Sequence, residues 1–168
     1  MRAWEADDGE GQDERLSTSS DYGHRAAADH GPAASYAPYL RTGQTLYLSG
    51  HLARRNGAVW IGRLGDDIAL EEGRSAARAT AIDLLATLQH ATGNLDSIAR
   101  IAKLTVMVAS MPNFFEQHLV ANGASELFGE VFPDMGPHAR SAFGVVQLPL
   151  RACVEIELIA ELAPPGAA

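Results

Sequence analysis

The stretch from residue 136 to residue 162 constrains the fold more than any other part of the chain. Small and apolar residues alternate from Ala139 to Leu148, and Pro149 then breaks the pattern. In the segment that follows, every second residue is apolar: Val154, Ile156, Leu158, Ala160 and Leu162. Alternation with a period of two is typical of a strand with one buried face. The stretch therefore predicts two consecutive strands, which we expect to pair as a hairpin.

Charged residues mark the other sides of these two strands. Glu155, Glu157 and Glu161 lie opposite the apolar residues of the second strand, interrupted by Ile159, and Arg140 stands at the start of the first strand. If the strands form a hairpin, the arginine and the early glutamates meet at the same end of the sheet. Such a pair is suited to an anionic substrate, because a guanidinium binds a carboxylate through two hydrogen bonds.

The remaining elements follow from periodicity and turn residues. We predict a strand over 45–49, a hairpin with an Asn-Gly turn at 56–57, a helix over about 70–92 that closes at Gly93, and a strand over 98–109. A second helix is expected from Pro112 to about Phe128, with Phe115, Leu119 and Leu127 or Phe128 facing inward. The order β-β-α-β-α-β-β indicates an α+β fold with two helices on one face of a mixed sheet. The uncovered face predicts self-association.

Charge separates an N-terminal segment from the rest. Residues 1–33 hold eight acidic residues against three arginines, in a chain whose formal net charge is -8. A segment so polar buries too little apolar surface to offset its ordering entropy, so we expect a mostly disordered extension. The predicted domain covers residues 34–163, and residues 164–168 form a short tail.

Composition excludes several classes of function. The negative net charge argues against a nucleic-acid partner. The single cysteine, Cys153, rules out an internal disulfide and a cysteine-based zinc cluster. No histidine spacing suits a metal, and no phosphate loop or dinucleotide fingerprint predicts a cofactor. Without a membrane-length apolar run or a hydrophobic signal region, the chain is expected to be a cytoplasmic protein with no membrane partner.

Six motifs then carry a resemblance to a known family. They are Arg41-Thr-Gly43, Leu48-Ser-Gly50, Glu71-Glu-Gly73 with Ala76-Ala-Arg78, Val120-Ala-Asn122, His138-Ala-Arg-Ser with Leu148-Pro, and Val154-Glu-Ile-Glu-Leu-Ile-Ala160. In order and spacing the chain resembles the RidA-like family of reactive-intermediate imine deaminases, older members of which were labelled L-PSP endoribonucleases. The resemblance spans about residues 36–162. It implies a chorismate mutase-like fold, a homotrimer around a central barrel, and clefts between subunits that hydrolyse a small carboxylated imine to ammonia and a keto acid.

The resemblance also implies roles for individual residues. From sequence alone, an intersubunit salt bridge is the favoured role of Arg140. The resemblance instead implies that Arg140 is the arginine that anchors the substrate carboxylate. Glu155 corresponds to the residue that holds or activates the hydrolytic water. Asn122 matches a position near the cleft, where it supports the site or caps a turn. Tyr36 matches the site tyrosine by spacing, although Tyr39 matches its Pro-Tyr context.

The departures from the family pattern concern the same region. Where the family has Ser-Gly-Gln, this chain has Ser-Gly50-His51, so Gly50 and His51 join the predicted substrate-binding set. His51 either adds a titratable group to the pocket or hydrogen-bonds at an interface. Ser141 is also assigned to the site, but Ala142 replaces the usual cysteine, and His138 replaces a proline.

These changes leave three alternatives to a general imine deaminase. The first is an enzyme of a specialised pathway that uses the same cleft for a larger metabolite. The second is a trimer that binds small carboxylates without turning them over. The third is an endoribonuclease, which the acidic charge disfavours.

Overall fold

The computed structural model describes residues 35–164; the predictions for the acidic extension (1–33) and for most of the tail lie outside them. The strands are β1 (Tyr39–Thr42), β2 (Thr45–Leu52), β3 (Arg54–Arg55), β4 (Ala58–Val59), β5 (Ile98–Ala109), β6 (Ala139–Val145) and β7 (Val154–Leu162). The α-helices are α2 (Leu70–Thr92) and α3 (Gln117–Val131). Short 3-10 helices cover Leu95–Ser97, Pro133–Met135 and Pro149–Arg151. No helix among residues 35–164 is long and apolar enough to cross a membrane.

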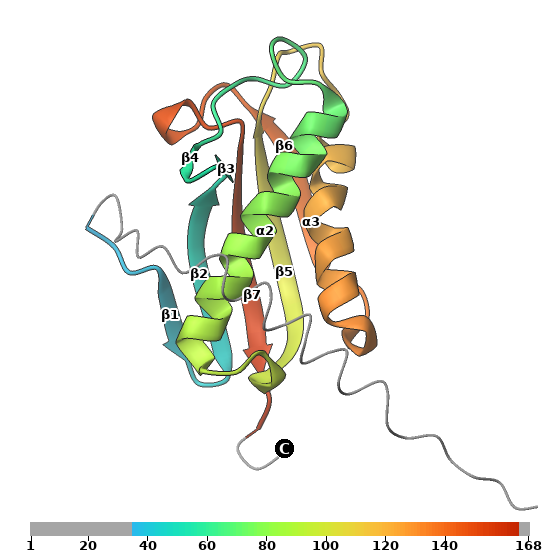
Figure 1. Cartoon of the computed structure of the whole chain (residues 1–168). Helices are drawn as coiled ribbons and strands as arrows, with labels where there is room; N and C mark the ends of the chain where they lie inside the picture. Colours follow the sequence, from blue (N-terminus) through green and yellow to red (C-terminus); the bar gives the residue numbers. More distant parts are fainter. Residues whose placement is uncertain (1–34, 165–168) are drawn as a thin grey trace, which may run out of the picture.

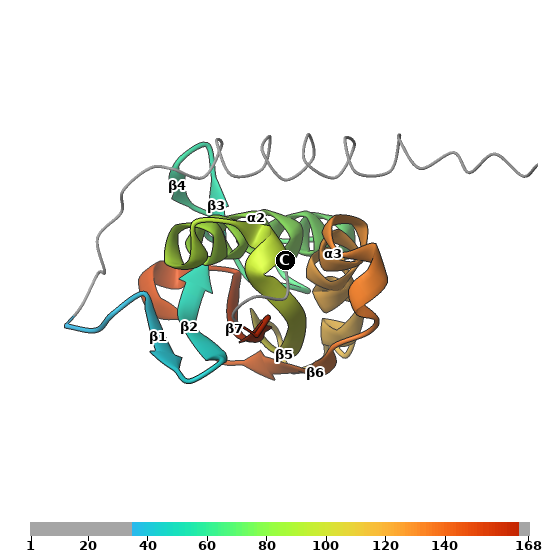
Figure 2. The same ribbon diagram turned by 90° about the horizontal axis from the view of Figure 1, so that it is seen from below.

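The main sheet has five strands in the order β1-β2-β7-β5-β6. Neighbouring strands are antiparallel except β5 and β6, which run parallel. Both α-helices cover the same face of this sheet, and no helix of residues 35–164 lies over the opposite face (Figures 1 and 2). The predicted α+β architecture, with two helices on one face of a mixed sheet, is confirmed.

The predicted hairpin between the last two strands is wrong, because β5 lies between β6 and β7. The residues that join them pass over the end of β5, where the backbone N–H of Ala109 donates to the carbonyl of Cys153 and that of Ser110 to the carbonyl of Val145. Burial explains the choice. All five apolar residues of β7 on one side are buried, whereas β6 has no buried residue. The strand with the complete apolar face takes an interior position, and β6 becomes the edge.

The N-terminal strands also differ from the prediction. The chain is already a strand from Tyr39, and β1 joins β2 through a tight turn in which Gly43 has a φ of 60°. The expected Asn-Gly turn is present, with positive φ at Asn56 and Gly57. It joins β3 and β4, which form a separate two-stranded sheet.

The core lies between the sheet and the helices. The predicted inward face of α2 is confirmed, with Ala77, Ala81, Leu84, Leu85 and Leu88 all buried. The second helix begins five residues later than predicted, at Gln117, because the segment before it forms a turn in which the N–H of Phe114 donates to the carbonyl of Met111. This turn buries Phe114 and leaves the side chain of Phe115 78% exposed, so the predicted inward position of Phe115 is wrong.

Helix α3 is held against α2 by close packing and by ion pairs. Arg74 pairs with Glu126 at 2.9 Å, and Arg78 pairs with Glu130. Beneath these pairs Gly123 lies against the backbone of Arg74. The contact determines where α3 places its polar side chains relative to β6.

Candidate functional site

Arg140 projects from β6 onto α3. In the β5–β6 register it lies beside Leu104, which is fully buried, so both residues face the helix layer. Nη1 of Arg140 donates to Oδ1 of Asn122 at 2.9 Å and to Oγ of Ser125 at 2.8 Å. Nη2 donates to the carbonyl of His118 at 3.1 Å. Arg140 and Asn122, two of the predicted site residues, are therefore in direct contact.

Among residues 35–164, no counter-ion neutralises the charge of this guanidinium. All three of its hydrogen-bond partners are neutral, and within residues 35–164 it makes no ion pair. A guanidinium also has more N–H donors than these three contacts use. A half-buried cation without a counter-ion favours the binding of an anion beside it.

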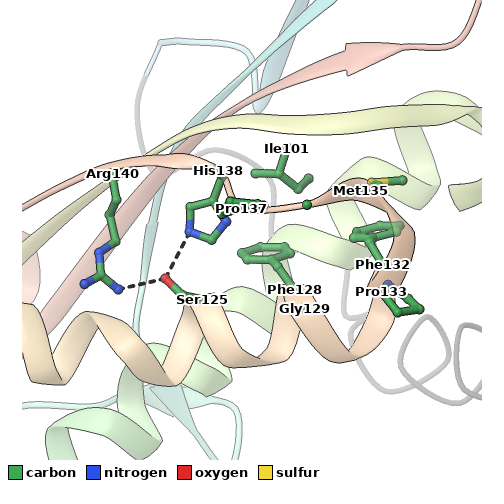
Figure 3. Close-up of a pocket in the computed structure, with 11 residues that line it drawn as sticks. Ile101, Ser125, Phe128, Gly129, Phe132, Pro133, Met135, Pro137, His138 and Arg140 are labelled. Carbon is green, nitrogen blue, oxygen red and sulfur yellow. Dashed lines mark hydrogen bonds between the residues drawn. The ribbon is translucent and has the colours of Figure 1, made fainter.

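A pocket of about 490 Å³ opens next to Arg140, between the C-terminal half of α3 and the segment that leads into β6 (Figure 3). Its polar end consists of Arg140, Ser125 and His138. The rest of the lining is apolar or glycine: Ile101, Phe128, Gly129, Phe132, Pro133, Met135, Gly136 and Pro137. The pocket thus combines one positive group with an extended apolar wall, as small-molecule sites commonly do.

Ser125 links the two basic side chains of the pocket. Its Oγ lies 3.0 Å from Nε2 of His138 and accepts from Arg140, so its hydroxyl proton is available to Nε2 of a neutral imidazole (Figure 3). Desolvation by burial lowers the pKa of His138, and the charge of Arg140 lowers it further. Sequence reasoning missed Ser125. The sequence could have indicated Ser125, because it follows Asn122 by three residues in a predicted helix and residues at that spacing share a helix face.

Glu155 lies on the opposite face of the sheet from Arg140. It pairs with Met107 of β5, three residues along from Leu104 in a regular part of the strand, and residues an odd number apart face opposite sides. Arg140 and Glu155 therefore do not meet at one end of the sheet in a single chain, and that prediction is wrong. The error follows from the assumed hairpin.

The surroundings of Glu155 raise the pKa of its carboxyl group. A side chain at Gly50 would overlap Oε1 of Glu155, so the backbone of Gly50 lies directly against the carboxylate. Desolvation raises the pKa of Glu155, and the nearby charge of Glu157 raises it further. Gly50 and Glu155, both predicted site residues, are brought together on the face without helices.

The other predicted residues are placed apart from Arg140. Ser141 lies on the same side as Glu155, where its Oγ accepts from Nζ of Lys103 at 3.0 Å. Tyr36 precedes β1 and is 49% exposed. The neighbouring residue of Tyr36, Ala37, accepts through its carbonyl from Oγ of Ser49.

His51 is bonded between β2 and α2. Its Nδ1 lies 2.8 Å from the carbonyl of Ser49, and its Nε2 lies 2.8 Å from Oγ1 of Thr87. Desolvation lowers the pKa of His51 and outweighs the opposing effects of the Ser49 hydrogen bond and of Asp83. Both ring nitrogens thus have partners inside the chain, on the helix-covered face.

Replacing His51 with alanine should weaken the fold and flatten its pH dependence. We expect the free energy of unfolding at pH 7.5 to fall by about 1–3 kcal/mol, because the partners of the ring lose their hydrogen bonds. The lowered pKa means that the folded state favours neutral His51 more than the unfolded chain does, in which the imidazole takes up a proton near pH 6.5. The wild type should therefore lose stability as the pH falls from 7.5 to 5, and the variant should lose less.

Urea denaturation at both pH values measures this difference. His118→Ala, which removes an exposed imidazole, is the control. Its free energy of unfolding should stay close to that of the wild type at both pH values. Equal pH dependence in the wild type and the His51 variant would contradict the proposed neutral state.

Comparisons with known proteins agree with this fold. A family model described as "YjgF/chorismate mutase-like, putative endoribonuclease" matches residues 20–162. Protein TCP17 of Trypanosoma cruzi is 43% identical over 142 residues, which cover 83% of this chain and 89% of that protein. The crystal structure of Atu1372, a protein of unknown function from Agrobacterium tumefaciens, is 38% identical with a TM-score of 0.77, over 90% of this chain and 99% of that one. A structure described as a putative endoribonuclease from Shewanella oneidensis is 28% identical with a TM-score of 0.81, over 89% and 98% of the two chains.

Proposed function

The chain belongs to the YjgF/chorismate mutase-like family, and on this premise we propose that it is an imine deaminase-like hydrolase. Its substrate class is a small carboxylated imine, and its products are ammonia and a 2-oxo acid. The observation that carries the proposal is the guanidinium of Arg140, which has only neutral partners within the described residues and stands at the mouth of a pocket. A fixed positive fork of this kind suits a carboxylate.

The proposed site needs two copies of the chain. Arg140 and Glu155 lie on opposite faces of the sheet in one chain, so the Glu155 that acts beside a given Arg140 comes from another subunit. The face without helices supports association, since Leu40, Tyr47 and Phe143 are each 45% or more exposed. Leu40 pairs with Tyr47, and Tyr47 with Ile159, so an apolar row crosses three strands. We propose a homotrimer in which this face is buried and clefts form between subunits.

The chemistry follows from the two charged groups. Arg140 holds the carboxylate, and Glu155 takes a proton from water as the water oxygen adds to the imine carbon. That proton then passes to the nitrogen, which gives a carbinolamine. A second proton moves from the carbinolamine hydroxyl to the nitrogen, the C–N bond breaks to release ammonia, and the C–O bond becomes the C=O bond of the 2-oxo acid. Burial moves the pKa of Glu155 upward, which makes the carboxylate a better proton acceptor.

The direct test follows the decay of 2-iminopropionate and 2-iminobutyrate with and without the protein. We expect the release of ammonia and 2-oxo acid to accelerate in proportion to protein concentration. Unchanged rates at high protein concentration would contradict the activity. Binding of 2-oxo acids without turnover would instead support a carboxylate-binding protein, and cleavage of RNA by purified protein would favour an endoribonuclease.

Gly50→Ala tests Glu155 without removing it. The new Cβ overlaps the carboxylate of Glu155, a movable group, and the φ of Gly50 is one that alanine adopts freely. We expect turnover to fall about 10- to 100-fold, because the carboxylate must shift by a distance that matters for proton transfer. The melting temperature should stay within a few degrees of wild type. Arg41→Met, which changes an exposed side chain outside the site, is the control for turnover. Full activity of the Gly50 variant would remove Glu155 from the mechanism.

A further inference from the structure

We propose that the pocket beside Arg140 selects 2-imino acids with a bulky apolar side chain, aromatic or branched, over those with a methyl or ethyl group. This inference rests on the proposed function and names the substrate class of the same site. It is based on the shape and lining of the pocket, on its single positive end and on one open position in α3.

The wall opposite the positive end is built from the hydrophobic core. Phe128 is 2% exposed, and Phe132 and Met135 are half-buried and pack against the same core. Ile101 of β5 and the prolines on either side of Met135 complete the lining. Figure 3 shows these side chains beyond His138 as seen from Arg140, so a ligand anchored at the arginine would extend along them. An apolar group placed there leaves water without displacing a polar contact.

The polar end sets the direction of the ligand. Arg140 and His138 both bond to Oγ of Ser125, so the two side chains lie side by side at one end of the pocket. Burial and the charge of Arg140 lower the pKa of His138, which leaves the arginine as the cation of this end at neutral pH. Among the residues that line the pocket, the charged or titratable side chains are Arg140 in β6 and His138 just before it. The lining residues from α3 and β5 have no charged or titratable side chain. A carboxylate therefore has one preferred anchor, and the side chain of the acid points toward the apolar wall.

The volume favours a large group. A pocket of about 490 Å³ is within the usual range for whole small ligands. A ligand with a methyl side chain would leave the half-buried side chains of Phe132 and Met135 in contact with water, whereas a phenyl or isobutyl group would cover them. Each added methylene in such a pocket improves binding by a factor of about 10 or more.

Gly129 offers a precise way to fill the pocket. It lines the pocket from an exposed position on α3, and a Cβ at this position would meet no atom within 4 Å. Gly129→Leu therefore adds an isobutyl group at a position that lines the pocket, with no clash at Cβ. Gly129→Ala is the matched control, because it makes the same change of helix propensity with little loss of volume.

The experiment measures binding of phenylpyruvate and pyruvate to the full-length protein by calorimetry, since 2-oxo acids are the stable products of the proposed reaction. We expect phenylpyruvate to bind at least about 10-fold more tightly than pyruvate. In Gly129→Leu, phenylpyruvate should lose at least about 10-fold in affinity and pyruvate less than about 3-fold, while Gly129→Ala keeps the wild-type preference. Thermal unfolding monitored by circular dichroism confirms that each variant is folded.

The outcomes separate this inference from the proposed function. Equal affinity for the two acids, no binding of either, or an unchanged preference in folded Gly129→Leu would overturn the selectivity. Turnover of 2-iminopropionate and of the phenylpyruvate imine at equal rates would also overturn it and leave the deaminase activity intact. The expected preference in binding, without turnover of either imine, would uphold the pocket and contradict the enzyme.

Discussion

Arg140→Met is expected to reduce imine turnover by about 100- to 1,000-fold. Methionine is similar in length but carries no charge and donates no hydrogen bond, so the substrate carboxylate loses the guanidinium that would anchor it in the pocket. Hydrogen bonds between charged groups contribute about 1.5–3 kcal/mol each, and a bidentate contact contains two. The loss should appear in kcat/KM with 2-iminobutyrate as the substrate.

The controls for Arg140 separate charge from geometry and from folding. Arg140→Lys keeps the charge without the planar fork and should recover only part of the activity. Arg41→Met removes an exposed guanidinium that bonds only to Gly43 and Gln44, and it should be fully active. Because Arg140→Met also removes three hydrogen bonds to α3, its melting temperature must be measured beside its activity. A folded Arg140→Met variant with wild-type turnover would remove the proposed anchor.

Gly123→Ala is expected to destabilise the fold by about 3 kcal/mol or more. The added Cβ would overlap the backbone carbonyl oxygen of Arg74, which cannot rotate away as a side chain does. Helices α2 and α3 would have to separate, and overpacking of this kind typically costs 1–3 kcal/mol, more where backbone must move. The shift would also displace Asn122 and Ser125 from Arg140, so activity should fall with stability.

Gly129→Ala in the same helix is the matched control for Gly123. Alanine is favoured over glycine in a helix by about 1 kcal/mol, and the position is open, so this variant should be slightly more stable than the wild type. Urea denaturation of the three proteins gives the comparison. A Gly123→Ala variant as stable as Gly129→Ala would show that the close approach of the helices is not a constraint.

Much of the local structure could be predicted from residue patterns. The alternation from Val154 to Leu162 identified β7 and its buried face, and the run from Ile98 to Ala109 identified β5. The apolar face of α2 and its end at Gly93, which has a left-handed φ of 76°, also followed from sequence. These features depend on interactions between residues close in the chain, which a pattern of period two or 3.6 records directly.

The predicted site residues lie in two groups, and their role in binding or catalysis stays a prediction. The family resemblance singled out Arg140, Asn122, Gly50 and Glu155, and the structure places the first two in contact and the last two in contact. The pair of Arg140 and Asn122 lies on the helix-covered face of the sheet, and the pair of Gly50 and Glu155 lies on the opposite face. The structure also bonds His51 into α2 and brings Ser125 and His138 beside Arg140.

The sequence by itself determined most of the elements, the buried faces of α2 and β7, and the presence of residue types able to bind a carboxylate. Only the tertiary structure decided that β5 separates β6 from β7, and with it which side of the sheet each charged residue occupies. The physical reason is that alternation of apolar and polar residues shows which residues of a strand share a face. It does not show which other strand pairs with that strand. That choice depends on the burial available to whole strands, and in this fold the fully apolar face of β7 took the interior position.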